Sequence, residues 1–109
     1  MIACGADGVI AVVSNEAPAL LVALVEAALT GERDEAARLQ LKLFPLMRAN
    51  FRESNPIPVK WALHRLGLIH DVLRLPLVPL SKGLHRPVEE ALKEAGLLDE
   101  AGNPAEEAP

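Results

Sequence analysis

The sequence predicts an α/β protein in which one buried strand is followed only by helices. The strand is Gly8 to Val13, a continuous and mostly β-branched apolar run, and no second run like it follows. Apolar residues without polar alternation are typical of a strand that is covered on both faces, as in parallel sheets. Because a lone strand leaves its backbone N–H and C=O groups without ladder partners, we expect the neighbouring strands to lie outside this sequence.

A first helix is predicted to follow the strand and to run to about Thr30. Asn15 can cap it, since its side-chain oxygen can accept an N–H of the first turn, and Glu16 and Pro18 both suit early helical positions. Gly31 supplies the left-handed residue that ends it. The apolar face of this helix carries Leu20, Leu21, Leu24, Val25, Ala28 and Leu29.

A second helix is predicted from Arg33 to Phe51. Its buried face is marked by residues at steps of three and four: Ala36, Leu39, Leu43, Leu46, Met47 and Asn50. Pro45 lies in the middle, where it removes the hydrogen bond to the carbonyl of Leu41 at a cost of about 3 kcal/mol. We therefore expect a kink there and a packing reason for the proline.

The remaining sequence predicts two more helices and no further strand. One helix is expected from Pro58 to Gly67, and another from Arg86 to Ala95, with Ser81 or His85 before it and Gly96 ending it. Between them, Val72 to Leu80 looks extended, but its two prolines argue against a central strand. From Asp99 onward the composition is Ala, Glu, Gly and Pro, and we expect disorder.

Charge and cysteine content exclude several classes of protein. The net charge is -4, and the basic residues are scattered singly without interleaved aromatic residues, so we expect no nucleic-acid partner. Cys4 is the single cysteine, which fits a reducing cytoplasm. The stretch from Ala17 to Thr30 is apolar but short and contains Glu26, so we expect neither a signal peptide nor a membrane span.

No metal site or phosphate-binding loop is predicted. His64, His70 and His85 lack the spacing of metal ligands. Three carboxylates of the last helix, Glu89, Glu90 and Glu94, are expected on a solvated face. The glycines of Gly5 to Gly8 precede the strand instead of following it, which reverses the context of a phosphate loop.

Lys60 stands beside Trp61 on the first turn of a predicted helix. A desolvated lysine can form a Schiff base. At this position, however, the lysine stem is expected to pack over Trp61 while the ammonium group reaches water.

Several segments together resemble the dihydrodipicolinate synthase family. The most specific is Glu53 to Leu63, which reads ESNPIPVKWAL and resembles a signature near the end of these enzymes. Gly8 to Asn15, reading GVIAVVSN, resembles their eighth barrel strand and the turn after it, and the spacing between the two fits. Gly67 to Ile69, Leu73 to Leu77 and Ala95 to Leu98 match in order, so the resemblance covers nearly the whole chain apart from its tail.

The resemblance implies a (β/α)8 barrel followed by a helical domain. In this interpretation residues 1–31 are the last βα unit of the barrel, residues 32–98 are the helical domain and residues 99–109 are an acidic tail. It also implies a lyase that condenses pyruvate with aspartate semialdehyde through a lysine Schiff base, on the path to lysine and diaminopimelate. Such an enzyme is cytoplasmic, needs no cofactor and is a homo-oligomer, a tetramer in the family.

The resemblance places no catalytic residue in this chain. The Schiff-base lysine and the proton-relaying tyrosine belong to earlier barrel strands, the chain has no tyrosine, and Lys60 belongs to the helical domain. Only Ile10 carries over, as a residue lining the pyruvate pocket. We therefore expect the chain alone to be inactive, and to fold poorly or aggregate because its apolar surfaces lack their cover.

Two alternatives remain open on this interpretation. Ala11 stands where the family often has serine, and Glu16 replaces a commonly apolar residue, so the parent enzyme can be a related pyruvate-dependent aldolase with another aldehyde, of the sugar-acid or N-acetylneuraminate lyase type. The chain can also be a stand-alone helical module that docks onto an intact synthase.

Overall fold

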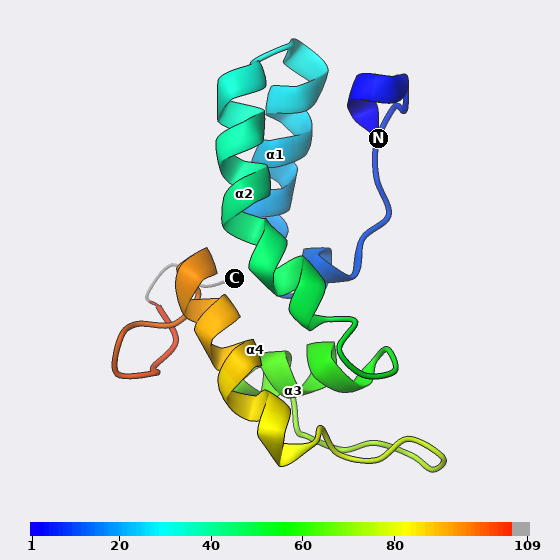
Figure 1. Cartoon of the computed structure of the whole chain (residues 1–109), viewed down its shortest axis with the longest axis vertical. Helices are drawn as coiled ribbons and strands as arrows, with labels where there is room; N and C mark the ends of the chain where they lie inside the picture. The colour runs from blue at the N-terminus through cyan, green and yellow to red at the C-terminus, as the bar shows by residue number, and fades with distance from the viewer. Residues whose placement is uncertain (106–109) are drawn as a thin grey trace.

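The structure is a computed structural model that describes residues 1–105, and the helices dominate it (Figure 1). Two short 3-10 turns, η1 (Ile2–Cys4) and η2 (Val12–Asn15), precede four α-helices. The helices are α1 (Pro18–Thr30), α2 (Arg33–Ala49), α3 (Ile57–Arg65) and α4 (Lys82–Ala95). The prediction of a mostly helical chain is confirmed.

The predicted strand is not formed in the described part of the chain, where the only β-pairing is an isolated bridge between Leu98 and Pro104. Residues 8–11 have no regular structure, although Ala11 keeps an extended backbone with φ -144° and ψ 139°. The physical reason is that residues 1–105 offer no second strand to complete a ladder. The last two residues of the predicted strand instead close local hydrogen bonds in η2, with Val13 O accepting from Ala17 N at 2.9 Å.

The boundaries of α1 agree with the sequence at one end and differ at the other. Gly31 ends the helix with φ 83°, as predicted. The helix begins at Pro18, and Asn15 does not cap it: the Asn15 Nδ2 group donates to Val12 O at 2.9 Å inside η2. The predicted cap is wrong because Asn15 belongs to η2, and Glu16 and Ala17 separate it from the start of the helix.

The core joins α1 and α2, which run antiparallel side by side, to α3 and α4 at one end of the pair (Figure 1). Leu43 and Leu46 of α2 and Val88 and Leu92 of α4 are all 0% exposed. Burying a side chain of this size contributes about 1.5–3 kcal/mol. The apolar face predicted for α2 is therefore the face that holds the helices together.

The C-terminal part of the chain differs from its prediction in two places. Helix α4 begins at Lys82, four residues before the predicted start, and ends at Gly96 with φ 80°, as predicted. Residues 99–105 do not have the disorder expected of them, because they form a turn in which Arg65 Nη2 donates to Gly102 O at 3.0 Å and Lys93 Nζ donates to Glu100 O at 2.9 Å. The remainder of the predicted acidic tail, residues 106–109, lies outside the described residues.

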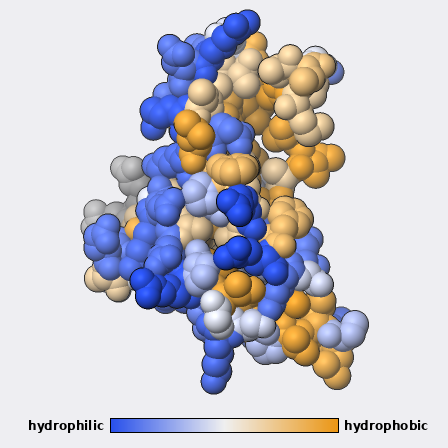
Figure 2. All heavy atoms as spheres, viewed as in Figure 1, coloured by the Kyte–Doolittle hydropathy of each residue, from blue (hydrophilic) through white to orange (hydrophobic). Residues whose placement is uncertain are grey.

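Large apolar side chains remain on the surface, and Figure 2 shows orange patches beside the polar surface. They include Val22, Leu29, Leu41, Phe44, Val72, Leu75 and Val78. Contiguous apolar surface of this kind marks an interaction site or a tendency to aggregate. Across the described residues, none of the helices has the length and apolar character needed to cross a membrane.

Candidate functional site

Ile10 lies on the extended segment between the two 3-10 turns, and its side chain is fully exposed. Beside it is a groove of about 430 Å³ between this segment and the pair α1–α2. The groove is lined mainly by apolar residues, among them Val9, Leu21, Leu24, Val25, Ala28 and Met47. The one predicted site residue therefore contributes an apolar wall that lacks cover on its outer side.

The position of Ile10 is fixed by the segment that follows it. Val13, three residues on, is 2% exposed and belongs to the hydrophobic core. The Ser14 hydroxyl donates to Ala11 O at 2.6 Å, which holds the first turn of η2. The residues before Ile10 have no comparable anchor within residues 1–105. Val9 is exposed, and the space that a side chain at position 8 would occupy is open.

A buried polar pair lies directly after this segment. Glu16 and Asn50 are both 0% exposed, and Asn50 Nδ2 donates to Glu16 Oε2 at 2.7 Å. Burial raises the pKa of Glu16 to about 7, against the opposing effect of the Asn50 hydrogen bond. The sequence indicated an early helical position for Glu16 and the buried face of α2 for Asn50. Two signals of the pair were available: a polar residue on the apolar face of α2, and a glutamate where the family commonly has an apolar residue.

Lys60 lines an open groove of about 590 Å³ between the start of α3 and the loop that follows this helix. Its Nζ group donates to the carbonyl of Val72 in the loop after α3. The aromatic ring of Trp61 stacks on His85 of α4, with ring centroids 4.7 Å apart and planes at 25°. Lys60 therefore ties the α3 end of the chain to a loop, and it lies on a different element from Ile10.

The three histidines lie on three different segments: α3, the loop after it and α4. His64 Nδ1 is 3.2 Å from Ile69 O, His85 Nε2 is 3.1 Å from Leu80 O, and His70 is exposed on the loop. No group of three histidine, cysteine or acidic residues that could hold a metal ion occurs within residues 1–105.

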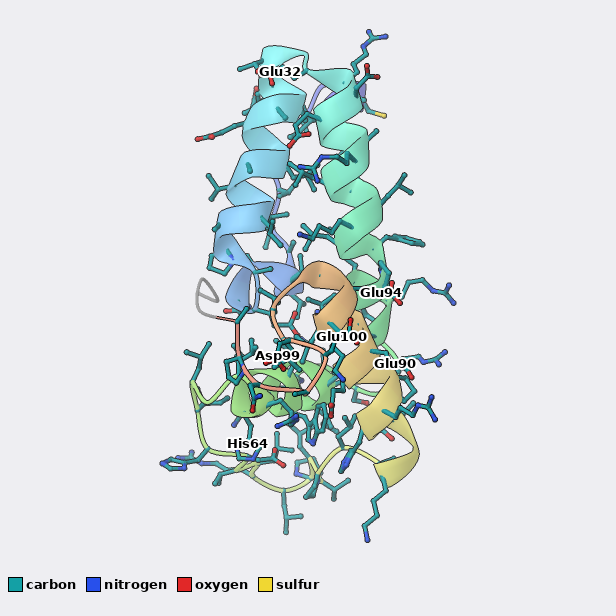
Figure 3. The ribbon with its side chains drawn as sticks, turned by 90° about the vertical axis from the view of Figure 1, so that its left-hand side faces the viewer. Glu32, His64, Glu90, Glu94, Asp99 and Glu100 are labelled. Carbon is teal, nitrogen blue, oxygen red and sulfur yellow. The ribbon has the colours of Figure 1, made fainter. Side chains whose placement is uncertain are left out.

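Glu89 and Glu90 of α4 form ion pairs with basic residues. Glu90 pairs with Arg86 at 2.7 Å, and Glu89, which is half-buried, lies 3.5 Å from Arg65. Figure 3 shows Glu90 and Glu94 on the outer side of α4, in agreement with the predicted solvated face.

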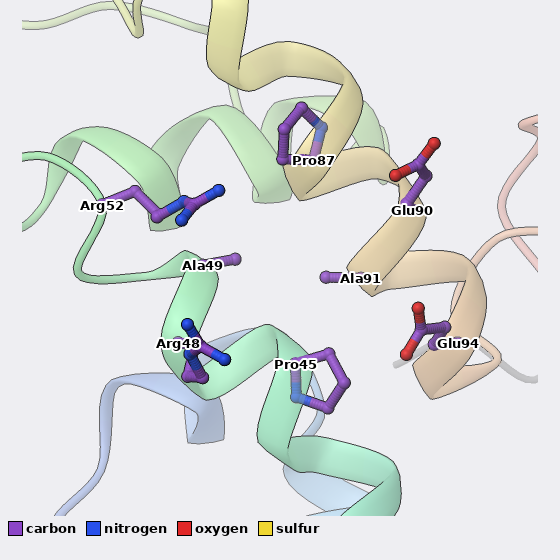
Figure 4. A pocket seen from close by; sticks show the side chains of 8 residues that line it. All are labelled: Pro45, Arg48, Ala49, Arg52, Pro87, Glu90, Ala91 and Glu94. Carbon is purple, nitrogen blue, oxygen red and sulfur yellow. The ribbon is translucent and has the colours of Figure 1, made fainter.

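A second groove, of about 220 Å³, separates the end of α2 from α4 (Figure 4). Arg48 and Arg52 line it from the α2 side, and Glu90 and Glu94 line it from α4. All four side chains are exposed. Exposed charges across a groove of this size are screened by solvent, so the arrangement adds little binding energy of its own.

Comparison with curated proteins places these features in one family. The chain is 52% identical over 94 residues to the 4-hydroxy-tetrahydrodipicolinate synthase of Marinobacter nauticus, covering 86% of this chain and 32% of that protein. It is 48% identical over 98 residues to the synthase of Kosmotoga olearia, covering 90% of this chain and 33% of that protein. The chain therefore spans about a third of the length of the relatives it matches.

Solved structures agree with the sequence relatives. Dihydrodipicolinate synthase from Thermotoga maritima superposes with a TM-score of 0.85 at 47% identity, covering 89% of this chain and 33% of that one. The chloride-inhibited enzyme of Acinetobacter baumannii, complexed with pyruvate, gives 0.85 at 43% identity, with 89% and 33% covered. The sequence pattern of the Dihydrodipicolinate synthetase family matches residues 1–95. The resemblance seen in the sequence is thus confirmed, and the chain belongs to the Dihydrodipicolinate synthetase family.

Proposed function

We propose that this chain is the carboxyl-terminal portion of a 4-hydroxy-tetrahydrodipicolinate synthase and that Ile10 forms one wall of its pyruvate pocket. One arrangement supports the proposal. Ile10 is fully exposed, it lies on an extended backbone segment without a strand partner in residues 1–105, and this segment borders an apolar groove. Residues 8–11 are suited to become a barrel strand once neighbouring strands supply their hydrogen bonds. The synthases that the chain matches are about three times as long, which leaves room for those strands.

In this proposal residues 1–31 complete the barrel, and residues 32–98 form the helical domain against it. The reaction is condensation of pyruvate with aspartate semialdehyde in the cytoplasm, on the path to lysine and diaminopimelate, in a homo-oligomer. The related structure complexed with pyruvate supports the choice of the first substrate. Active-site groups of such barrels lie at the carboxyl ends of the strands, where Ile10 would stand.

The contribution of Ile10 would be shape and exclusion of water. An apolar wall leaves the bound keto acid oriented by its polar partners elsewhere in the pocket and keeps water from the reacting carbon. The imine-forming lysine and the relay tyrosine must then come from the part of the relatives that this chain does not span. The chain contains no tyrosine, and the amine of Lys60 is engaged by a backbone carbonyl.

The test is complementation in two pieces. The chain is co-expressed with the remaining two-thirds of the Marinobacter nauticus synthase in a bacterium that lacks its own synthase and needs diaminopimelate for growth. The unaltered chain is expected to restore growth and Ile10→Asp is expected to abolish it. Ala23→Asp, on the exposed face of α1, is the matched control and should restore growth.

Two results would contradict the proposal. Growth with Ile10→Asp equal to growth with the unaltered chain would remove Ile10 from the pocket. Failure of the unaltered chain to restore growth, while it binds an intact synthase in a pull-down, would favour the docking-module alternative instead.

A further inference from the structure

The buried pair of Glu16 and Asn50 leaves two oxygen atoms without partners. Asn50 Nδ2 donates to Glu16 Oε2 at 2.7 Å, but Glu16 Oε1 and Asn50 Oδ1 are both buried and accept no hydrogen bond from residues 1–105. Buried oxygens in native proteins are nearly always paired, because an unpaired one loses its hydration without compensation. Two such atoms at the ends of one interacting pair therefore require an explanation.

A single proton satisfies both atoms. An ionised glutamate only accepts hydrogen bonds, and so does Asn50 Oδ1. When Glu16 is charged, the NH2 group of Asn50 is therefore the one donor of the pair, and it can serve only the oxygens of Glu16. A protonated carboxyl has one O–H donor, and an amide presents its donor and acceptor side by side. We propose that Glu16 carries a proton on Oε1 and donates it to Asn50 Oδ1, so that acid and amide form a proton-binding site closed by two parallel hydrogen bonds.

The surroundings of the pair favour the neutral acid. Burial raises the pKa of Glu16 to about 7, so a proton is held at pH values where an exposed glutamate has lost it. Helices α1, α2 and α3 all pack around η2, and none of their charged groups forms an ion pair with Glu16 within residues 1–105. Those groups are Glu26, Arg33, Asp34, Glu35, Arg38, Lys42, Arg48, Lys60, His64 and Arg65.

The pair connects two segments that are distant in sequence. Glu16 directly follows η2, the turn that fixes Ile10, whereas Asn50 stands at the carboxyl end of α2. Loss of the proton would leave Asn50 Nδ2 as the single donor of the pair for the two Glu16 oxygens, and it would leave Asn50 Oδ1 with no donor in the pair. Glu16 is thus a positioning residue for the Ile10 segment, and the inference holds for this chain whether or not the proposed reaction is correct.

The experiment follows unfolding in urea of the full 109-residue chain between pH 4.5 and 8.5. The glutamate pKa is 4.5 when unfolded and about 7 when folded, so the folded chain binds the extra proton in this window and stability must fall as pH rises through it. The unfolding equilibrium constant should therefore rise by roughly 150-fold across this window, about half of the limiting change of roughly 300-fold that the two pKa values set. In Glu16→Gln this component disappears, since a glutamine amide donates permanently to Asn50 Oδ1. Glu26→Gln, at an exposed site on α1, is the matched control and should keep the pH dependence.

A direct titration keeps the inference testable if Glu16→Gln does not fold. In the chain labelled with carbon-13 at its glutamate carboxyls, one signal should titrate near pH 7, well above the pKa of an exposed glutamate. All glutamates titrating near pH 4.5, or an unchanged pH dependence of stability in Glu16→Gln, would overturn the proposal.

Discussion

Replacing Leu43 by alanine tests whether the helices share one core. Leu43 is 0% exposed on α2, and removing most of a buried leucine side chain costs about 2–5 kcal/mol, from lost burial and from the cavity left behind. The single core that joins the helices leads us to expect cooperative unfolding of the chain, in place of the poor folding expected from the sequence. Because a domain of this size is stable by about 5–15 kcal/mol, Leu43→Ala should remove a large fraction of the total. Leu41, two residues earlier on the same helix, is 72% exposed and provides the same substitution outside the core.

The assay is urea unfolding followed by far-ultraviolet circular dichroism at low protein concentration. Leu43→Ala should lower the midpoint at an unchanged slope, whereas Leu41→Ala should change the free energy of unfolding by no more than about 0.5 kcal/mol. Equal destabilisation by the two variants would refute the reasoning, because it would mean that burial of the α2 face does not hold the fold together. Both measurements use the full chain.

Three further predictions concern the surface and one helix end. Ile10→Ser should leave the free energy of unfolding within about 0.5 kcal/mol of that of the unaltered chain, because the Ile10 side chain is fully exposed; a larger loss would place Ile10 in the core. Gly96→Ala should cost about 1 kcal/mol in the same assay, since Gly96 ends α4 at φ 80°, and no loss would contradict the left-handed cap. The chain should associate increasingly as its concentration rises, through exposed apolar residues such as Leu29 and Phe44; sedimentation as a monomer at all concentrations would count against this.

Features set by neighbouring residues could be predicted from the sequence. Gly31 and Gly96 end their helices because a left-handed residue is needed at those points, and the steps of three and four along α2 identify the face that includes Leu43 and Leu46. The predicted start of α2 at Arg33 was also correct, because the glycine that ends α1 lies two residues before it.

Features set by distant residues could not be predicted in the same way. The strand from Gly8 to Val13 was predicted from its composition, yet a strand needs partners that residues 1–105 do not supply. The bond between Glu16 and Asn50 joins positions 34 apart in sequence, and the turn of residues 99–105 depends on contacts with Arg65 and Lys93. In each case the tertiary environment, and not the local pattern, decides the conformation.

The candidate site also combines a feature indicated by the local sequence with features that depend on tertiary packing. The sequence pointed to Ile10 through a family motif, and its place in the pyruvate pocket remains a prediction. The groove beside it depends on how α1 and α2 pack against residues 1–11. Glu16, interpreted from the sequence as a helix-start carboxylate, became a buried acid because η2 turns it toward Asn50.

The most direct test of the central claim is reduction with borohydride in the presence of pyruvate, followed by mass spectrometry. The claim is that this chain provides a wall of the pyruvate pocket but not the amine that forms the imine. The chain alone should gain no mass, and when it is assembled with the remaining two-thirds of the Marinobacter nauticus synthase the adduct should appear on that partner piece. A pyruvate-derived adduct on this chain, at Lys60 above all, would contradict the account.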